Sequence, residues 1–399
     1  MSVLLKKATL TDYRQELKAD LLIDGGKIAE IGEISSDRPG IERVIDADGL
    51  TVMPSFVDLH VHFRDPGLTH KEDIETGCMA AVHGGYTFVN LMPNTSPVCS
   101  DMDTVKYVLD KAEKSGLCDI HQTVSITSGF DHKTTDHIKE LDGSIKWITD
   151  DGFGVDDTKT MLNAMNIAKE KGFGVMLHEE DSALTKINMY LAEELQTFRD
   201  IELAILTGCK THFCHVSTIN AAKYIIAGKK RCNHLSFEVS PHHLALNDTN
   251  GGKVAPPLRG EEHRKFLVEC IKAGEVDAIA TDHAPHTAED KANGMNGFTG
   301  LDLSFATCYT ALVKAGHITL SALSRLMSFN PAKLMGIDGG YIEQGAAANL
   351  VIVDTNAKFT ASESDIHSKS KNSPVLGQEF FGKVIMTIKG GKIVYEKAD

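Results

Sequence analysis

Six side chains suited to binding a metal stand at the ends of five apolar, strand-like runs: His60, His62, Asp151, His178, His215 and Asp282. Alternate side chains of an extended strand point to the same side, so His60 and His62 could hold one ion together. A lone histidine or aspartate at a strand end more often caps a turn or the next helix. Five such positions in one chain nevertheless predict a metal site.

The types of ligand indicate which metal and which chemistry to expect. Four imidazoles and two carboxylates favour zinc over calcium or magnesium. Six ligands are too many for one tetrahedral ion that keeps a position open, so we expect two zinc ions per chain, sharing one carboxylate and a water-derived hydroxide. Such a pair lowers the pKa of bound water to about 7 and polarises a carbonyl group. The sequence therefore predicts hydrolysis of an amide-like bond.

The middle of the chain alternates strand-like with helix-like segments, and this order has to position the ligands. Helical patterns cover residues 102–115, 158–170, 219–227 and 261–273, among others. The eight strand-like segments are residues 52–59, 86–91, 119–124, 144–149, 174–177, 212–214, 235–240 and 276–281. We therefore predict an α/β fold, a (β/α)8 barrel. The ligands then follow strands 1, 4, 5, 6 and 8, at the end of the barrel where such folds place their active sites.

Both ends of the chain show a different pattern, in which short apolar runs alternate with turn signals. Asp24-Gly25-Gly26 near the start and Gly390-Gly391 near the end are typical of tight β-hairpin turns. We expect the two ends to form one small β-sandwich domain together. The predicted domains are residues 1–52 and 341–399 for the sandwich and residues 53–340 for the barrel.

Composition excludes several other classes of protein. The chain has 55 acidic and 41 basic residues, and its net charge of −14 argues against nucleic acid or an anionic membrane as a partner. It has neither an apolar run of roughly 18 residues nor a signal-peptide pattern. The 8 cysteines are scattered, without the spacing of a disulfide framework or a zinc knuckle. We expect a cytoplasmic enzyme.

Several motifs resemble those of one enzyme family. Residues 58–67 read DLHVHFRDPG and residues 280–286 read ATDHAPH, which are similar to the signatures of dihydroorotases in the amidohydrolase superfamily. Four shorter motifs, NLMPNT, TDDG, CHVST and SPHHL, match in the same order, so the resemblance covers essentially the whole chain. It is closest to the bacterial type in which an aspartate, rather than a carboxylated lysine, bridges the two metals.

The resemblance implies a role for each predicted ligand. One zinc would be held by His60, His62 and Asp282, and the other by His178 and His215. Asp151 would be shared by the two ions. The adjacent Asp150 competes for this role, but the spacing between Asp151 and His178 fits the family pattern, so we choose Asp151. Asp282 would also be the catalytic acid and base, which moves a proton from water to the leaving nitrogen.

Substrate recognition is implied for a second group of residues: Arg64, Asn94, His286, Asn296 and Gly297. A guanidinium group meets a carboxylate with two parallel hydrogen bonds, so Arg64 suits a substrate that carries one. Three features depart from the family pattern: Ala255 stands where an asparagine is usual, Asn296 stands where a phenylalanine is usual, and the connection from Glu179 to Lys210 is shorter than expected. His242 and His243 are interpreted as packing residues near the site.

The resemblance thus implies the reversible cyclisation of N-carbamoyl-L-aspartate to (S)-dihydroorotate, a step of de novo pyrimidine biosynthesis. It also implies a homodimer and an association with aspartate carbamoyltransferase. One alternative is another cyclic amidohydrolase, such as an allantoinase, hydantoinase or dihydropyrimidinase. A second alternative is a catalytically silent, dihydroorotase-like scaffold subunit, which the loss of a ligand would favour; none of the six is missing.

Overall fold

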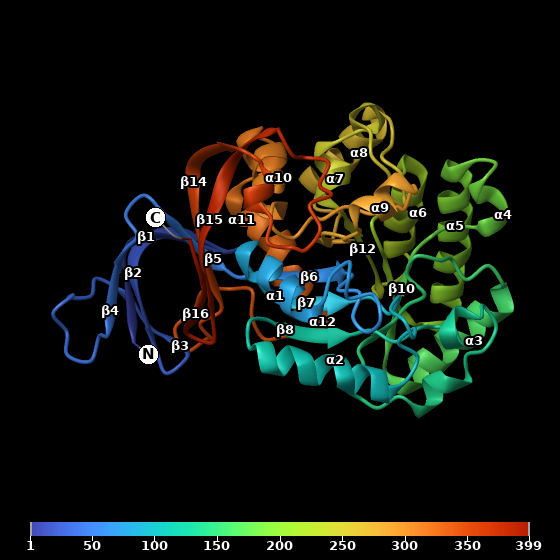
Figure 1. The fold of residues 1–399 in the computed structure, drawn as a ribbon, viewed down its shortest axis with the longest axis horizontal. Coiled ribbons are helices and arrows are strands. Elements are labelled where there is room, and N and C mark those ends of the chain that lie inside the picture. Colours follow the sequence, from blue (N-terminus) through green and yellow to red (C-terminus); the bar gives the residue numbers. More distant parts are fainter. Residues whose placement is uncertain (1, 398–399) are drawn as a thin grey trace.

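Both ends of the chain contribute strands to one mixed sheet, and the barrel lies between them in the sequence. The computed structural model describes residues 2–397, so Met1, Ala398 and Asp399 of the predicted domains lie outside the described part. Figure 1 shows the sheet on the left, with both termini, and the barrel on the right. The strands of this sheet are β1 (Val3–Thr11), β2 (Glu16–Asp24), β3 (Lys27–Gly32), β4 (Arg43–Asp46), β5 (Thr51–Pro54), β14 (Leu350–Thr360), β15 (Glu379–Lys389) and β16 (Lys392–Glu396).

Strand β5 joins the two ends of the chain within this sheet. The order is β16-β15-β14-β5-β1-β2-β3, with β4 also paired to β1. Strand β5 is parallel to β1 and antiparallel to β14. The predicted hairpin turns lie where expected, since Gly25-Gly26 links β2 to β3 and Gly390-Gly391 links β15 to β16. All four glycines have positive φ angles, which two-residue hairpin turns of this kind require.

Eight parallel strands form the barrel, as predicted. They are β6 (Phe56–Val61), β7 (Tyr86–Leu91), β8 (Asp119–Gln122), β9 (Trp147–Ile148), β10 (Gly174–Leu177), β11 (Lys210–Phe213), β12 (Leu235–Val239) and β13 (Ala278–Ile279). They pair as two groups, β6 to β8 and β9 to β13. Parallel bridges from Val124 to Ile148 and from Val61 to His283 connect the two groups, which closes the barrel.

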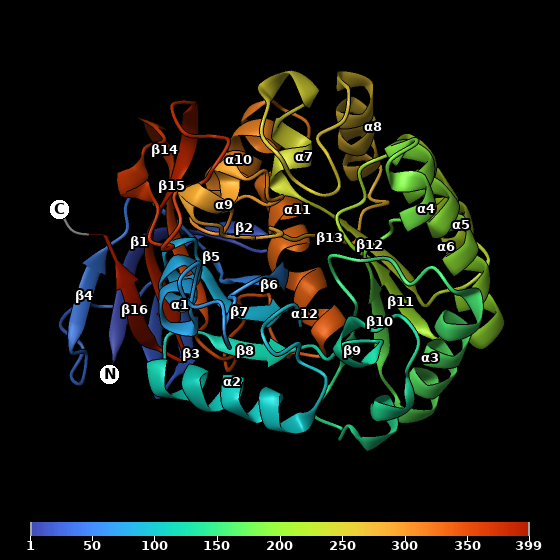
Figure 2. The same cartoon turned by 45° about the vertical axis from the view of Figure 1, so that its right-hand side comes forward.

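The outer helices follow the strands (Figure 2), and several of them, such as α1, α2 and α3, begin and end at recognisable caps. Helix α2, for example, begins after Asp101, whose side chain accepts from the backbone of Thr104, and ends before the left-handed Gly116. The helices are α1 (Ile74–His83), α2 (Met102–Ser115), α3 (Thr158–Lys171), α4 (Ser182–Thr185), α5 (Met189–Thr207), α6 (Ile219–Lys229), α7 (Pro241–Ala245), α8 (Glu261–Lys272), α9 (Ala288–Ala292), α10 (Ser304–Cys308), α11 (Leu320–Ser324) and α12 (Asn330–Met335). The helical patterns predicted at 102–115, 158–170, 219–227 and 261–273 correspond to α2, α3, α6 and α8.

Several predicted strands are shorter in the structure, since β9 and β13 keep only two residues each of the predicted 144–149 and 276–281. Another prediction was wrong in a different way. The apolar run 52–59 is not one strand but two, because the chain changes sheets at Ser55. There the backbone N–H of Ser55 donates to Asn349 of the end sheet, whereas that of Phe56 donates to Gly85 beside the barrel. A continuous apolar run hides this change, since both strands are buried on both faces.

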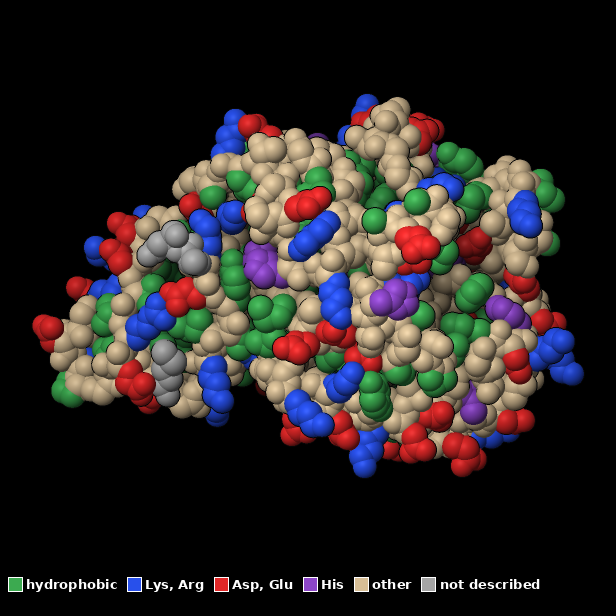
Figure 3. Space-filling view, in the orientation of Figure 1, with side chains coloured by type: hydrophobic (Ala, Val, Ile, Leu, Met, Phe, Trp, Pro, Cys, Tyr) green, Lys and Arg blue, Asp and Glu red, His purple; other side chains and the backbone are tan. Residues whose placement is uncertain are grey.

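On the face in Figure 3, acidic and basic side chains are mixed over both the sheet and the barrel. Within residues 2–397, no helix is long and apolar enough to cross a membrane.

Candidate active site

The predicted ligands and binding residues meet in one cavity at the carboxyl ends of the barrel strands. The cavity has a volume of about 300 Å³, and its lining includes Phe153, Ala255 and Met295. The residues of the predicted site that line it are His62, Arg64, Asn94, Asp151, His178, His215, Asp282, His286, Asn296 and Gly297. His60 lies directly beneath, fully buried. Residues separated by more than 200 positions thus share one site.

The first group of ligands surrounds the carboxylates of Asp151 and Asp282. Nε2 of His60 lies 3.1 Å from Oδ1 of Asp151, and Nε2 of His62 lies 3.4 Å from Oδ2 of the same carboxylate. Oδ1 of Asp282 lies 3.2 Å from Nε2 of His62 and 3.7 Å from Nε2 of His60. Four side chains from three strand ends therefore face one point.

Asp151 also faces the second group of ligands. Its Oδ1 lies 3.7 Å from Nδ1 of His178 and 3.6 Å from Nε2 of His215. Those two nitrogens lie 3.0 Å apart. Asp151 is the only one of the six residues that belongs to both groups, which is the position that a bridging ligand needs.

The donor atoms fit a metal better than they fit one another. Nε2 of His60 and Oδ1 of Asp151 are buried and form no hydrogen bond, although they lie close together. Two atoms that each bind zinc at about 2.1 Å in a tetrahedral arrangement lie roughly 3.4 Å apart, which is the spacing seen here. Two sets of three ligand atoms, one from His60, His62 and Asp151 and the other from Asp151, His178 and His215, each lie within 4.8 Å of one another. The cluster is compatible with a metal site.

The electrostatics of the cluster favour a cation. Burial alone would lower the pKa of His60, but the charge of Asp151 raises it well above its usual value. Burial would raise the pKa of Asp151, yet His60, His178 and His215 hold it well below its usual range. Against the effect of burial, the carboxylates of Asp151 and Glu180 raise the pKa of His178 to about 9. The buried carboxylates therefore attract the positive charge that a metal would supply.

A buried glutamate that the sequence analysis missed orients the deepest ligand. Glu238 lies in β12, inside the barrel, and its Oε1 lies 3.0 Å from Nδ1 of His60. Its Oε2 lies 3.0 Å from Nε2 of His212. A carboxylate on the second ring nitrogen fixes the orientation of a ligating histidine. The sequence did contain a sign of this role, because Glu238 stands inside the apolar strand 235–239. Acidic residues are almost never buried without a partner, so a buried glutamate predicts one.

The structure also separates the two adjacent aspartates. Oδ1 of Asp150 accepts from the backbone N–H of Thr127 at 2.9 Å, and its other oxygen accepts from the Thr127 hydroxyl group. Asp150 is thus held by the loop after β8 and takes no part in the ligand cluster, which leaves Asp151 as the candidate for the bridge.

Arg64 is a buried cation with no carboxylate within ion-pair distance among the described residues, although its Nε donates to the carbonyl group of Pro285 at 3.4 Å. It is 8% exposed, and its Nη2 lies 3.3 Å from Nε2 of His286. No ion pair of Arg64 is found within residues 2–397, and burial lowers its pKa to about 10. Its φ angle of 59° is strained for a residue other than glycine. A buried guanidinium group beside a cavity is suited to an anionic ligand.

The other predicted binding residues differ in how many of their polar groups are free to face the cavity. Oδ1 of Asn94 lies 2.8 Å from Nδ1 of His62, so Asn94 orients a ligand and keeps its amide nitrogen for the cavity. Gly297 lines the cavity, but its N–H donates to Lys253 and its carbonyl group accepts from Asn372. Ala255 lines the cavity too, without a polar side chain.

His242 and His243 are buried next to the site, at the start of α7. Their rings lie 4.4 Å apart, and neither residue belongs to a ligand cluster of the described residues. Burial lowers the pKa of His242 to about 4. Both side chains therefore stay neutral, which suits packing residues.

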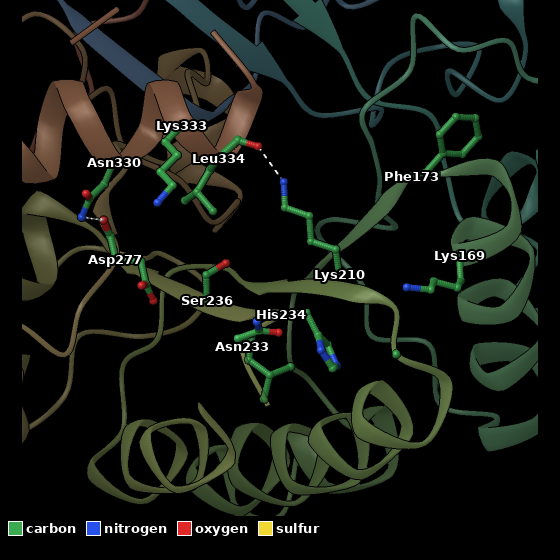
Figure 4. A pocket seen from close by; sticks show the side chains of 13 residues that line it. Lys169, Phe173, Lys210, Asn233, His234, Ser236, Asp277, Asn330, Lys333 and Leu334 are labelled. Atoms are coloured by element: carbon green, nitrogen blue, oxygen red, sulfur yellow. Dashed lines mark hydrogen bonds between the residues drawn. The ribbon is translucent and has the colours of Figure 1, made fainter. Parts of the chain in front are cut away.

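A larger cavity lies at the opposite end of the barrel, where β10, β11 and β12 begin (Figure 4). It has a volume of about 550 Å³ and is lined by Lys169, Lys210 and Lys333 among others. Lys210 donates to the carbonyl group of Leu334. No ligand cluster of the described residues lies here. The predicted ligands all lie at the other end, beside the carboxyl ends of the strands.

Comparison with known proteins agrees with this geometry. Residues 51–394 match the amidohydrolase family. The chain is 46% identical to a dihydroorotase of Clostridium botulinum (strain Eklund 17B / Type B), with all of both chains covered. It is 38% identical to a dihydroorotase of Clostridium acetobutylicum, with 96% of each chain covered.

Solved structures with the same fold are also related. An L-hydantoinase (dihydropyrimidinase) from Arthrobacter aurescens is 26% identical, with a TM-score of 0.89 over 100% of this chain and 96% of that one. A D-hydantoinase (dihydropyrimidinase) from Thermus sp. is also 26% identical, with a TM-score of 0.87 over 100% and 97%. With its barrel, its two-ended sheet and its cluster of histidines and aspartates, the chain belongs to the amidohydrolase family.

Proposed function

We propose that the protein is a dihydroorotase, which interconverts N-carbamoyl-L-aspartate and (S)-dihydroorotate in pyrimidine biosynthesis. One observation carries the choice of substrate. Arg64 is buried beside the ligand cluster without a carboxylate partner, and dihydroorotate brings the carboxylate that it lacks. The relatives that are 46% and 38% identical carry the same name.

The proposed cofactor is a pair of zinc ions. His60, His62 and Asp282 would hold one, His178 and His215 the other, and Asp151 both. When bound, the two ions would activate water and polarise the ring carbonyl group. Four imidazoles with two carboxylates form a donor set that zinc prefers.

The remaining residues would bind the substrate and move its proton. Arg64 would pair with the carboxylate, and Asn94 and His286 would complete its hydrogen bonds. Asn296 and Gly297 would contact the ring at the cavity rim. Asp282, buried and 3.2 Å from Nε2 of His62, would take the proton of the attacking water and deliver it to the leaving ring nitrogen.

The other proposals concern the protein in the cell. We propose a homodimer, because Leu191, Leu195, Phe198 and Leu206 of α5 are between 41% and 72% exposed, and such apolar faces mark contact surfaces. The resemblance also favours an association with aspartate carbamoyltransferase. All 8 cysteines are free thiols, which is typical of the cytoplasm.

The runner-up function is a hydantoinase or dihydropyrimidinase, the names of the structural neighbours. Their substrates need no carboxylate, so they would leave Arg64 buried and unpaired. An unsatisfied buried polar group costs about 1–3 kcal/mol, and a charged one more.

The first prediction compares substrates that differ by one group. Dihydrouracil is dihydroorotate without the carboxylate, so the zinc-loaded enzyme should prefer dihydroorotate by at least about tenfold in kcat/KM. The measurement is the ring absorbance in the ultraviolet, with allantoin as a third substrate. A preference for dihydrouracil or allantoin would reject the proposed function.

The second prediction concerns the metal. Chelation should abolish turnover and zinc should restore it. Asp151→Asn should lower the zinc content by at least one ion per chain, because both ligand groups depend on that carboxylate. Asp150→Asn is the matched control and should keep the zinc content of the wild type. Elemental analysis measures both, and equal contents in the two variants would contradict the assignment.

The third prediction concerns proton transfer. Asp282→Asn should reduce kcat by about 10²–10⁴, the usual contribution of a general acid and base, or by more if zinc is also lost. Zinc content measured on the same sample separates the two effects. A variant that retains more than a tenth of wild-type turnover would show that another group moves the proton.

The fourth prediction concerns Arg64. Arg64→Ala should lower kcat/KM for dihydroorotate by about 10- to 100-fold, because a charge-assisted hydrogen bond is worth about 1.5–3 kcal/mol. Turnover of dihydrouracil should fall much less. Arg38→Ala, which changes an exposed arginine of an ion pair with Glu30, is the control. Equal losses on both substrates would mean that Arg64 supports the fold and does not recognise the carboxylate.

A further inference from the structure

A second group of metal-type ligands lies outside the active site, where the barrel meets the end sheet. His83 is the last residue of α1, Asp302 precedes α10, and His367 follows a short helical turn at Glu363–Asp365. Ligand atoms of these three side chains lie within 4.8 Å of one another. No predicted role of the chain uses them.

The carboxylate of Asp302 is the centre of this group. Its Oδ1 lies 2.9 Å from Nδ1 of His83 and 3.5 Å from Nδ1 of His367. The same oxygen accepts from the backbone N–H of His367 at 2.8 Å. Burial would raise the pKa of Asp302, but the hydrogen bonds from His367 and His83 lower it below its usual range.

The second oxygen of Asp302 shows that these contacts leave the group incomplete. Asp302 is only 8% exposed, so bulk water does not replace a missing partner, and its buried Oδ2 has no hydrogen-bond partner. Among the described residues, no lysine or arginine forms an ion pair with it, since the nearby Lys383 is paired with Asp365 at 2.8 Å. A small cavity of about 20 Å³, lined by His83 and Asp302, adjoins the group. That volume is enough for one water molecule or one ion.

The two imidazoles can complete a metal site with this carboxylate. Their rings lie 3.9 Å apart, with 34° between the planes. His83 is buried, whereas the side chain of His367 is 34% exposed and has room to turn. The ring of Tyr395 closes one side, with its centre 5.0 Å from that of His83. Two imidazoles, one carboxylate and one water make a donor set of the kind that zinc takes.

We propose that His83, Asp302 and His367 form a further metal site, separate from the active site, that binds one zinc or similar divalent transition-metal ion. The ion ties the end of α1 to the segment 366–372. This segment also reaches the active site. The side chain of Asn372 accepts from the backbone N–H of His286 at 3.3 Å and donates to the carbonyl group of Gly297 at 3.0 Å. The metal thus holds one end of the segment 366–372, and Asn372 at the other end hydrogen-bonds to His286 and Gly297 at the cavity rim.

The test counts metal ions in the full-length protein after removal of metal and titration with Co²⁺. The wild type should bind one equivalent more than His367→Asn, which changes a partly exposed side chain, and one more than Asp302→Asn. The additional equivalent should appear as a visible Co²⁺ band in the wild type minus variant spectrum. His317→Asn is the control, because it removes a histidine from another part of the barrel, and it should bind as much as the wild type.

Equal binding by the wild type and both variants would overturn the proposal and leave a hydrogen-bonded cluster without metal. The count is a difference between variants, so it does not depend on whether dihydroorotate is the substrate. In His367→Asn, KM for dihydroorotate should rise several-fold with kcat little changed, because the active-site ligands are untouched. A fall in kcat with an unchanged KM would contradict the link from this site to the cavity rim.

Discussion

The charge of Asp151 organises the whole catalytic end of the barrel. Its buried carboxylate lies within 3.7 Å of nitrogens from His60, His178 and His215, and these belong to three different strand ends. A buried carboxylate needs compensation, and the closed barrel supplies it by bringing the imidazoles to Asp151. The attraction of the site for cations depends on this one group.

Much of this arrangement could be predicted from the sequence. The alternation of strands and helices gave the barrel, and ligands at strand ends gave the correct end of it, because parallel strands place their carboxyl ends together. The hairpin turns followed from the Gly-Gly pairs. These features are local, and a single window of sequence contains the information for each of them.

Other features could not be predicted, because they depend on contacts between distant residues. The change of sheet at Ser55 is set by hydrogen bonds to Asn349 and Gly85, and the apolar run shows no sign of it. Glu238 acquires its role only because it faces His60 across the barrel, 178 positions away. His83, Asp302 and His367 come from three segments, and no motif links them.

The site also holds buried charges of both signs, so one part of it attracts cations and another part attracts anions. Asp151 and Asp282 attract cations, while Arg64, two residues after His62, keeps a buried positive charge in the same cavity. A ligand that carries both a polar carbonyl group and a carboxylate can satisfy both parts together. The strained backbone at Arg64, His215 and Asp282, each with a positive φ angle, shows that the fold tolerates local cost to aim these side chains.

The pairing of β5 with β14 has a consequence for how the chain is made. These strands are about 300 residues apart, so β5 cannot complete its pairing until β14 has left the ribosome. Until then β5 presents an unpaired edge, which is prone to join other chains. Synthesis of β14 therefore covers an edge that could lead to aggregation, and a chain truncated before β14 would keep that edge exposed.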